Sequence, residues 1–221
     1  KTTGGRVIFS VVKPGGVHRD ITPDQFDHIV HTLEGIKDEY AQIVKTFVND
    51  SSVKNRLVGV GHISKEDAAK LSMVGPFLRA SGVDYDVRNL RNGGYAYLDD
   101  FQPVTRTEGD CYARVLVRTQ EVLQSIDIIE EMISKIPAGD IDVKVTGAPA
   151  DGAEACNVLE QPRGECYYYA KGNGTKYLDR MRMRTPTSQN LAGMAVSLKG
   201  CDVAAPCASF MKTSFSLWQS R

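Results

Sequence analysis

Apolar residues recur every three or four positions along two long stretches of the chain, which predicts two amphipathic helices. The first is introduced by Thr22 and Pro23, residue types suited to the N-cap and the first helical position, and extends to about residue 47. The second begins at Asp110 and keeps the helical period until Pro137, which cannot continue it. These two helices are expected to form the largest part of the hydrophobic core.

Shorter elements surround them. Ser64 and Asp67 resemble a capping box, which predicts a short helix to about residue 73, and Thr187 or Ser188 is expected to cap a last helix to about residue 198. Residues 75–108 show no clear period and are predicted to form a long ordered loop. Four apolar or alternating runs predict strands: Val7–Val12, Ile141–Val145, Cys166–Ala170 and Tyr177–Met183. The last two flank Asn-Gly residues and predict a hairpin. The pattern predicts one mostly helical α+β domain over residues 1–221.

Composition narrows the possible functions. The formal net charge is zero, so no global field attracts nucleic acid, and no nucleic-acid partner is expected. No apolar run reaches the roughly 20 residues that a membrane span needs, and no stretch has the pattern of a signal peptide. We therefore expect contact with a membrane only through partner subunits. Because the chain starts at Lys1 and runs directly into an apolar stretch, it is expected to begin inside a longer protein.

Several residues could carry chemistry, but none belongs to a common catalytic motif. The five cysteines form no C-x-x-C pair, which argues against both a disulfide framework and a thiolate metal site. His18 lies in a glycine-flanked loop and could relay protons near neutral pH, although its residue type and position alone favour a packed or solvated role. Arg114 lies within an apolar helix, so it must either be exposed or be paired, for example with Asp110.

Six segments, in their order and spacing, resemble one protein family. They are Pro14–Asp20, Arg56–Ala68, Gly75–Arg88, Gly109–Arg118, Glu160–Glu165 and Arg184–Leu191. Together they resemble the C-terminal part of the large subunit of energy-converting, membrane-associated nickel–iron hydrogenases, and of the homologous quinone-site (49 kDa-type) subunit of respiratory complex I. About residues 205–221 depart from the family pattern. The resemblance implies a hydrogenase large-subunit-like helical core with small β-hairpins.

The resemblance also implies a site. In the hydrogenase branch, Arg163 would overhang the nickel–iron centre, and Pro162 and Thr187 would line the same pocket. Nickel is held there by four cysteines in two C-x-x-C pairs, and neither pair is present, so this chain alone is expected to hold no metal and to be inactive. In the complex I branch, the equivalent cavity binds the quinone headgroup, and His18 could join a proton relay. Arg163 and the Thr185–Thr187 segment favour the hydrogenases, whereas His18 favours complex I.

Three functions remain open from the resemblance. The favoured one is the catalytic core of an enzyme that interconverts H₂ with protons and electrons, on the cytoplasmic side of a membrane. An iron–sulfur small subunit would supply electrons, and ion-translocating membrane subunits would use the energy. The alternatives are a quinone-reducing subunit of a complex I-like NADH dehydrogenase and a metal-free scaffold. Cysteine pairs in the parent protein would separate the first from the other two.

Overall fold

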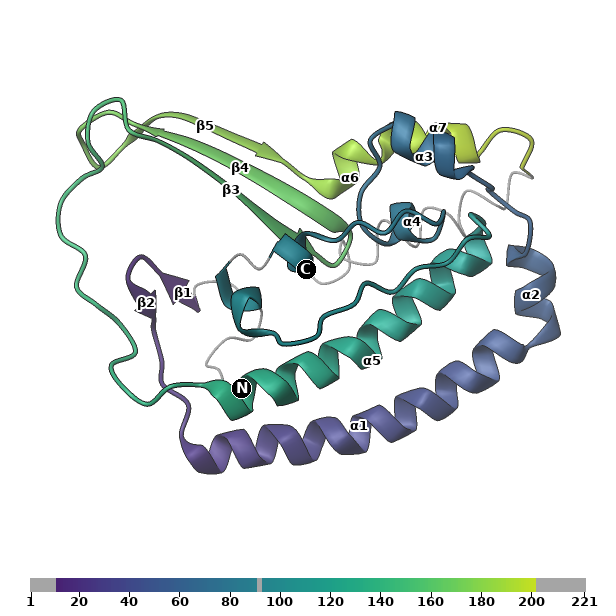
Figure 1. Ribbon diagram of the computed structural model, residues 1–221, viewed down its shortest axis with the longest axis horizontal. Helices are drawn as coiled ribbons and strands as arrows, with labels where there is room; N and C mark the ends of the chain where they lie inside the picture. Colours follow the sequence, from purple (N-terminus) through teal and green to yellow (C-terminus); the bar gives the residue numbers. More distant parts are fainter. Residues whose placement is uncertain (1–10, 91–92, 202–221) are drawn as a thin grey trace.

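The computed structural model describes residues 11–90 and 93–201. Most of the strand predicted at Val7–Val12 and the predicted off-family tail at about 205–221 therefore lie outside the described residues. A layer of two long helices lies on one side of the protein and a three-stranded sheet on the other, joined through a region of short helices (Figure 1). The mostly helical α+β fold predicted from the sequence is confirmed.

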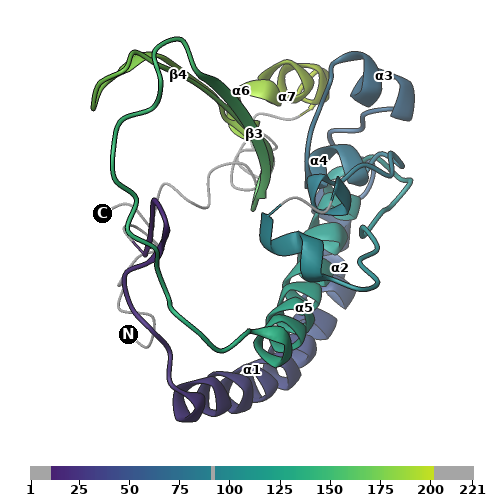
Figure 2. The ribbon, with the colours of Figure 1, turned by 60° about the vertical axis from the view of Figure 1, so that its left-hand side comes forward.

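The helical layer consists of α1 (Pro23–Asn49) and α5 (Cys111–Lys135), which run side by side in both views (Figures 1 and 2). Both predicted helix starts are confirmed. The Gln25 side chain accepts a hydrogen bond from the backbone N–H of Thr22 at 3.0 Å, as a capping box requires. The Asp110 carboxylate accepts one from the N–H of Ala113 at 2.8 Å. The layer is tied together by the Tyr112 hydroxyl, which donates to the carbonyl of Val48 at 2.8 Å.

Short helices connect the two long ones and contain much of the core. Asp50 caps α2 (Ser51–Leu57), and Ser64 caps α3 (Lys65–Lys70) as predicted. The segment predicted as an ordered loop holds α4 (Pro76–Arg79) and the 3₁₀ turns η1 (Val87–Leu90) and η2 (Gly93–Tyr97). One buried apolar cluster joins α3 to α4 and consists of Ile63, Ala68, Met73, Phe77 and Leu78. The segment is therefore part of the core.

The sheet is antiparallel with the order β3–β4–β5, formed by Glu154–Gln161, Gly164–Gly172 and Leu178–Arg184. The predicted hairpin is confirmed as β4 and β5, whereas β3 was not predicted. The strand predicted at Ile141–Val145 is wrong. Within the described part of the chain, that segment makes a single bridge, to the small hairpin of β1 (Val12–Lys13) and β2 (Gly16–Val17).

The C-terminal helical stretch is divided into α6 (Pro186–Gln189) and α7 (Leu191–Ser197). Its cap is Thr185, so the prediction of Thr187 or Ser188 was wrong by two or three residues. Pro186 explains the difference, because proline favours the first helical position and places the cap just before it. No helix among residues 11–90 and 93–201 is long and apolar enough to cross a membrane.

Candidate functional site

A cluster of five charged side chains is buried where α4, η1, α5 and β3 meet. Two are guanidinium groups and three are carboxylates, and no side chain is more than 13% exposed. The members are Arg79, Asp86, Arg88, Glu121 and Glu160. Buried charges on this scale must be paired, so their partners determine what the cluster can do.

Arg79 is the centre of the cluster. Its Nε and Nη2 donate to Oε1 of Glu121 at 2.9 and 2.6 Å. Its Nη1 lies 3.0 Å from Oε1 of Glu160 and 3.0 Å from Oδ2 of Asp86. One guanidinium therefore contacts all three carboxylates and joins helix α5 to strand β3.

Arg88 pairs mainly with one carboxylate, that of Asp86. Its Nε and Nη2 bind the two oxygens of Asp86 at 2.9 and 2.6 Å, a bidentate arrangement. The guanidinium also lies 4.5 Å from the centre of the Phe101 ring and 3.7 Å from Glu121. Asp86 is thus held by two arginines, while Glu160 has close contact with Arg79 alone.

The charges of the cluster do not balance. Two guanidiniums and three ionised carboxylates would leave a net charge of −1 in a buried region. Glu160 is the carboxyl with the fewest cationic contacts, and its pKa is raised from 4.5 to about 7. Burial is the main cause; Arg79 pulls the pKa down, and the nearby Asp86 carboxylate pushes it up. Glu160 is therefore the member that changes its charge near neutral pH.

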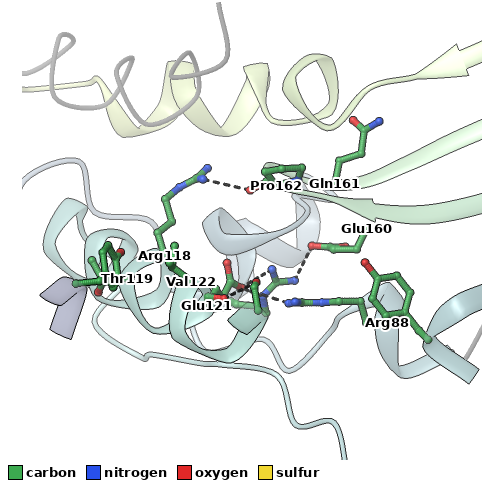
Figure 3. Close-up of a pocket in the computed structure, with 12 residues that line it drawn as sticks. Arg88, Arg118, Thr119, Glu121, Val122, Glu160, Gln161 and Pro162 are labelled. Atoms are coloured by element: carbon green, nitrogen blue, oxygen red, sulfur yellow. Dashed lines mark hydrogen bonds and ion pairs between the residues drawn. The ribbon is translucent and has the colours of Figure 1, made fainter. Parts of the chain in front are cut away.

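A cavity of about 680 Å³ adjoins the cluster (Figure 3). It is lined by residues of α1, α5, η2 and β3, including Tyr40, Tyr95 and Glu160. Arg118 of α5 reaches across it and donates to the carbonyl of Pro162 at 3.1 Å. Burial lowers the pKa of Arg118, and the guanidinium of Arg163 pushes in the same direction.

The end of the cavity is formed by the tight turn between β3 and β4. Gln161 pairs with Gly164, so only Pro162 and Arg163 make the turn. The backbone of Gly75 packs directly on it: a Cβ atom at Gly75 would lie 2.3 Å from the Cα of Gly164. Gly75 also has φ +70°, which favours glycine. Two glycines at this contact hold the turn firmly against the start of α4.

The predicted site residues fall in two places. Pro162 lines the cavity, and Arg163 is half-buried beside it in the turn. Thr187 lies in α6, which packs against β4, the strand that follows the turn. His18 is exposed next to the β1–β2 hairpin, whose neighbouring residues line a separate cavity, so the structure does not bring it to the turn. The functional roles of all four residues stay predictions.

Sequence reasoning missed the buried carboxylates as a site. Glu160 belongs to the block that carried the family resemblance, yet nothing in that block shows its burial. Arg114 forms no ion pair with Asp110, its expected partner, which acts on it only electrostatically at longer range. The buried guanidinium instead donates to the carbonyls of Gly61 and Gly109 at 2.6 and 2.9 Å and stacks on Phe77. Asp110 instead caps α5 and accepts from the N–H of Gly59 at 2.7 Å.

The described residues do not fit a nickel centre on their own. Within residues 11–90 and 93–201, no group of three or more His, Cys, Asp or Glu side chains could hold a metal ion. The residues around the cavity present guanidinium, carboxyl, phenol and amide groups, with no thiolate among them. The cavity wall suits proton exchange and the stabilisation of negative charge.

Comparison with known protein families and sequences finds similarity to polypeptides of several oxidoreductases. The family described as the respiratory-chain NADH dehydrogenase 49 Kd subunit matches residues 1–152. The C/D polypeptide of NADH-quinone oxidoreductase from Phocaeicola vulgatus is 33% identical over 92% of this chain and 39% of the relative. The carbon monoxide-induced hydrogenase of Rhodospirillum rubrum is 31% identical over 91% of this chain and 56% of the relative. The D polypeptide of F420H2 dehydrogenase from Methanosarcina mazei is 33% identical, with the same coverage.

A solved structure of a respiratory membrane complex contains a chain with a similar fold. A chain of the membrane-bound sulfane sulfur reductase, an archaeal respiratory membrane complex, superposes with a TM-score of 0.73 at 29% identity. The match covers 85% of the present chain and 57% of the other. The chain thus spans about half the length of the curated relatives it matches.

Proposed function

Because the chain belongs to the family of the respiratory-chain NADH dehydrogenase 49 kDa subunit, we propose that it is the C-terminal part of the redox subunit of a membrane-associated oxidoreductase. Its relatives are named as parts of NADH-quinone oxidoreductases, a hydrogenase and an F420H2 dehydrogenase. The proposed role of this chain is to form one wall of the reaction site at the β3–β4 turn. Electrons would come from an iron–sulfur partner subunit, and membrane subunits would anchor the complex.

Arg163 is the observation that carries this proposal. It lies half-buried in a two-residue turn that is fixed by the Gly75–Gly164 contact, and it makes no ion pair with any residue in the described part of the chain. Arginine stays protonated at any physiological pH. A positive charge without an ion pair, carried on a turn whose backbone is fixed, is suited to stabilising negative charge that develops on a substrate as it accepts electrons.

Arg118 strengthens the positive character of the turn. It donates to the Pro162 carbonyl, so its guanidinium lies beside the same turn. Burial and the charges of Arg163 and Arg79 lower its pKa, while Glu121 raises it. Two cations at one turn would favour an electron-rich substrate and disfavour a cationic one.

We propose that the parent protein interconverts H₂ with protons and electrons. Arg163 and the Thr185–Thr187 segment favour this reaction because they match the hydrogenase pattern. The hydrogenase relative, aligned with 91% of this chain, supports that choice. Nickel would need thiolate ligands that the described residues do not supply, so the role proposed for this chain involves no step at the metal. Quinone reduction is the second candidate, favoured by the family match over residues 1–152.

The test uses the parent complex purified without oxygen. Its nickel content, H₂ evolution from reduced viologen and quinone reduction are measured for the wild type, Arg163→Lys and Arg163→Met. Lysine keeps the charge but loses the planar fork of donors, so both variants should lose activity, Arg163→Met by about 100-fold or more. Arg182→Lys, an exposed position on β5, is the matched control.

The outcomes separate the candidates. H₂ evolution with stoichiometric nickel supports the hydrogenase, and quinone reduction without nickel supports the second candidate. Neither activity, in a stably assembled complex, indicates a scaffold. Full activity in Arg163→Met would overturn the proposed role of the turn.

A further inference from the structure

The buried cluster holds more acid than base, and this imbalance has to be resolved within the protein. Among the groups joined by ion pairs, Arg79 and Arg88 supply two positive charges, while the three carboxyl groups could supply three negative ones. Arg118 acts on Glu121 only at longer range, without an ion pair. Leaving a net charge in a region this buried is expensive, and binding one proton removes it. The structure therefore calls for one protonated carboxyl at moderate pH.

Contacts identify which carboxyl carries the proton. Asp86 receives a bidentate pair from Arg88 and a further contact from Arg79 at 3.0 Å. Glu121 accepts two hydrogen bonds from Arg79. Glu160 accepts one, from Nη1 of Arg79 at 3.0 Å, and its side chain is 6% exposed. Glu160 is the least compensated of the three.

Glu160 also has a route for its proton. It lines the cavity of about 680 Å³, at the end of β3 that leads directly into the Pro162–Arg163 turn. Figure 3 shows it on the wall of this cavity. The titratable or charged groups around it are Tyr40 (α1), Arg79 (α4), Tyr85, Asp86, Arg88 (η1), Tyr95 (η2), Arg118 and Glu121 (α5).

We propose that Glu160 is a proton-exchanging group, which stores one proton inside the charged cluster and delivers it through the cavity to the substrate reduced at the β3–β4 turn. The destination of the proton rests on the proposed function. Storage of the proton rests on the buried cluster alone. The pKa of about 7 means that the carboxyl is half-protonated near neutral pH, the condition under which a proton donor is also readily recharged.

The exchange balances in both directions. The Glu160 carboxyl loses H⁺ to a substrate that has accepted an electron from the iron–sulfur partner, so the substrate gains one proton per electron. The carboxylate that remains is held by Arg79 through the 3.0 Å contact. A proton from bulk solvent, carried by water as hydronium into the cavity, then restores the carboxyl, and the water returns to solvent.

The first measurement is an infrared pH titration of the assembled complex, in which a protonated carboxyl gives a C=O band that shifts in D₂O. The spectrum of Glu160→Gln is subtracted from that of the wild type. Glu154→Gln is the matched control, because Glu154 lies at the exposed opposite end of the same strand. The expected result is one carboxyl band that titrates near pH 7 and is absent only from Glu160→Gln.

The second measurement is the pH dependence of turnover. The wild-type rate should fall as the pH rises above about 7, because the proton is lost from the donor. Glu160→Gln should turn over at least about tenfold more slowly, as expected when a proton-transfer group is removed. Its rate should also no longer fall as the pH rises above about 7. Glu154→Gln should keep both the wild-type rate and its fall at high pH.

Each outcome has a distinct meaning. A Glu160 band that is missing, or that titrates below pH 5, would show an ionised carboxylate and overturn the proposal. A band near pH 7 with an unchanged rate profile would overturn delivery to the substrate. A band near pH 7 together with full activity in Arg163→Met would overturn the proposed function of the turn while proton storage stands.

Discussion

Replacing Arg79 with Met removes the charge that all three carboxylates of the cluster share. The substitution keeps a long apolar side chain but deletes the two hydrogen bonds to Glu121 and the contacts to Asp86 and Glu160. The fully ionised cluster changes from a net charge of −1 to −2. Removing one partner of a buried ion pair costs roughly 3–5 kcal/mol, so a loss of about 4 kcal/mol in unfolding free energy is expected at pH 8.

The pH dependence of this loss follows from Glu160. Its pKa is raised in the folded state, from 4.5 to about 7, so the folded state binds the proton more tightly than the unfolded state. Its contribution to stability is therefore fully present below pH 4.5 and disappears as the pH rises through 7, by about 3 kcal/mol in all. Because Arg79 lowers this pKa, Arg79→Met should raise it further.

The assay is urea unfolding of the full-length protein, followed by circular dichroism at pH 5.5 and pH 8. The loss caused by Arg79→Met should be smaller at pH 5.5, where Glu160 is protonated. Adding Glu160→Gln should recover at least about 1 kcal/mol at pH 8, since it removes one unpaired carboxylate. A loss below about 1 kcal/mol, or an equal loss at both pH values, would contradict the charges assigned to the cluster.

Three further substitutions test how the site is held in place. Gly75→Ala should destabilise the protein by about 2 kcal/mol or more and reduce turnover. Gly59 has a similar φ of +71° but open space around it, so Gly59→Ala should destabilise the protein less. Equal effects of the two substitutions in thermal melts would contradict the contact of Gly75 with the β3–β4 turn. Asp110→Ala should lose about 2 kcal/mol in denaturant unfolding, because its carboxylate caps α5 and binds a loop N–H, and Asp110→Asn should lose less. Asn190→Ala should cost about 2 kcal/mol and speed hydrogen exchange at the Val74 amide, which the Asn190 side chain binds at 2.9 Å; unchanged exchange would disprove that role.

The elements that could be predicted from the sequence are those encoded by neighbouring residues. Thr22 and Pro23 begin α1, and Asp110 begins α5, because a cap acts only on the turn that follows it. The β4–β5 hairpin could be predicted because Asn173 and Gly174 lie in its connection, residues 173–177. Ser64 likewise caps α3 in the structure. In each case the physical cause lies within about four residues of its effect.

The errors arose where distant segments decide the structure. Strand β3 shows little apolar alternation, and it forms because its backbone pairs with β4 from Glu154 to Gln161. Residues 141–145 do alternate, but among the residues that the structure describes they form a single bridge, to the short β1–β2 hairpin. Arg114 is satisfied by carbonyl oxygens, one of Gly109 just before its own helix and one of the distant Gly61, so its partners could not be deduced from neighbouring carboxylates.

The charge imbalance at the candidate site is hidden in the sequence for the same reason. Lysine and arginine together equal aspartate and glutamate in number, so the chain as a whole is neutral. Packing selects a subset of these charges, taken from positions as distant as 79 and 160, and buries it with one acid in excess. An exposed carboxyl in excess would have no consequence, because solvent would screen it. Burial converts the same excess into a bound proton near pH 7, so the chemistry of Glu160 depends on the assembled fold as much as on its own side chain.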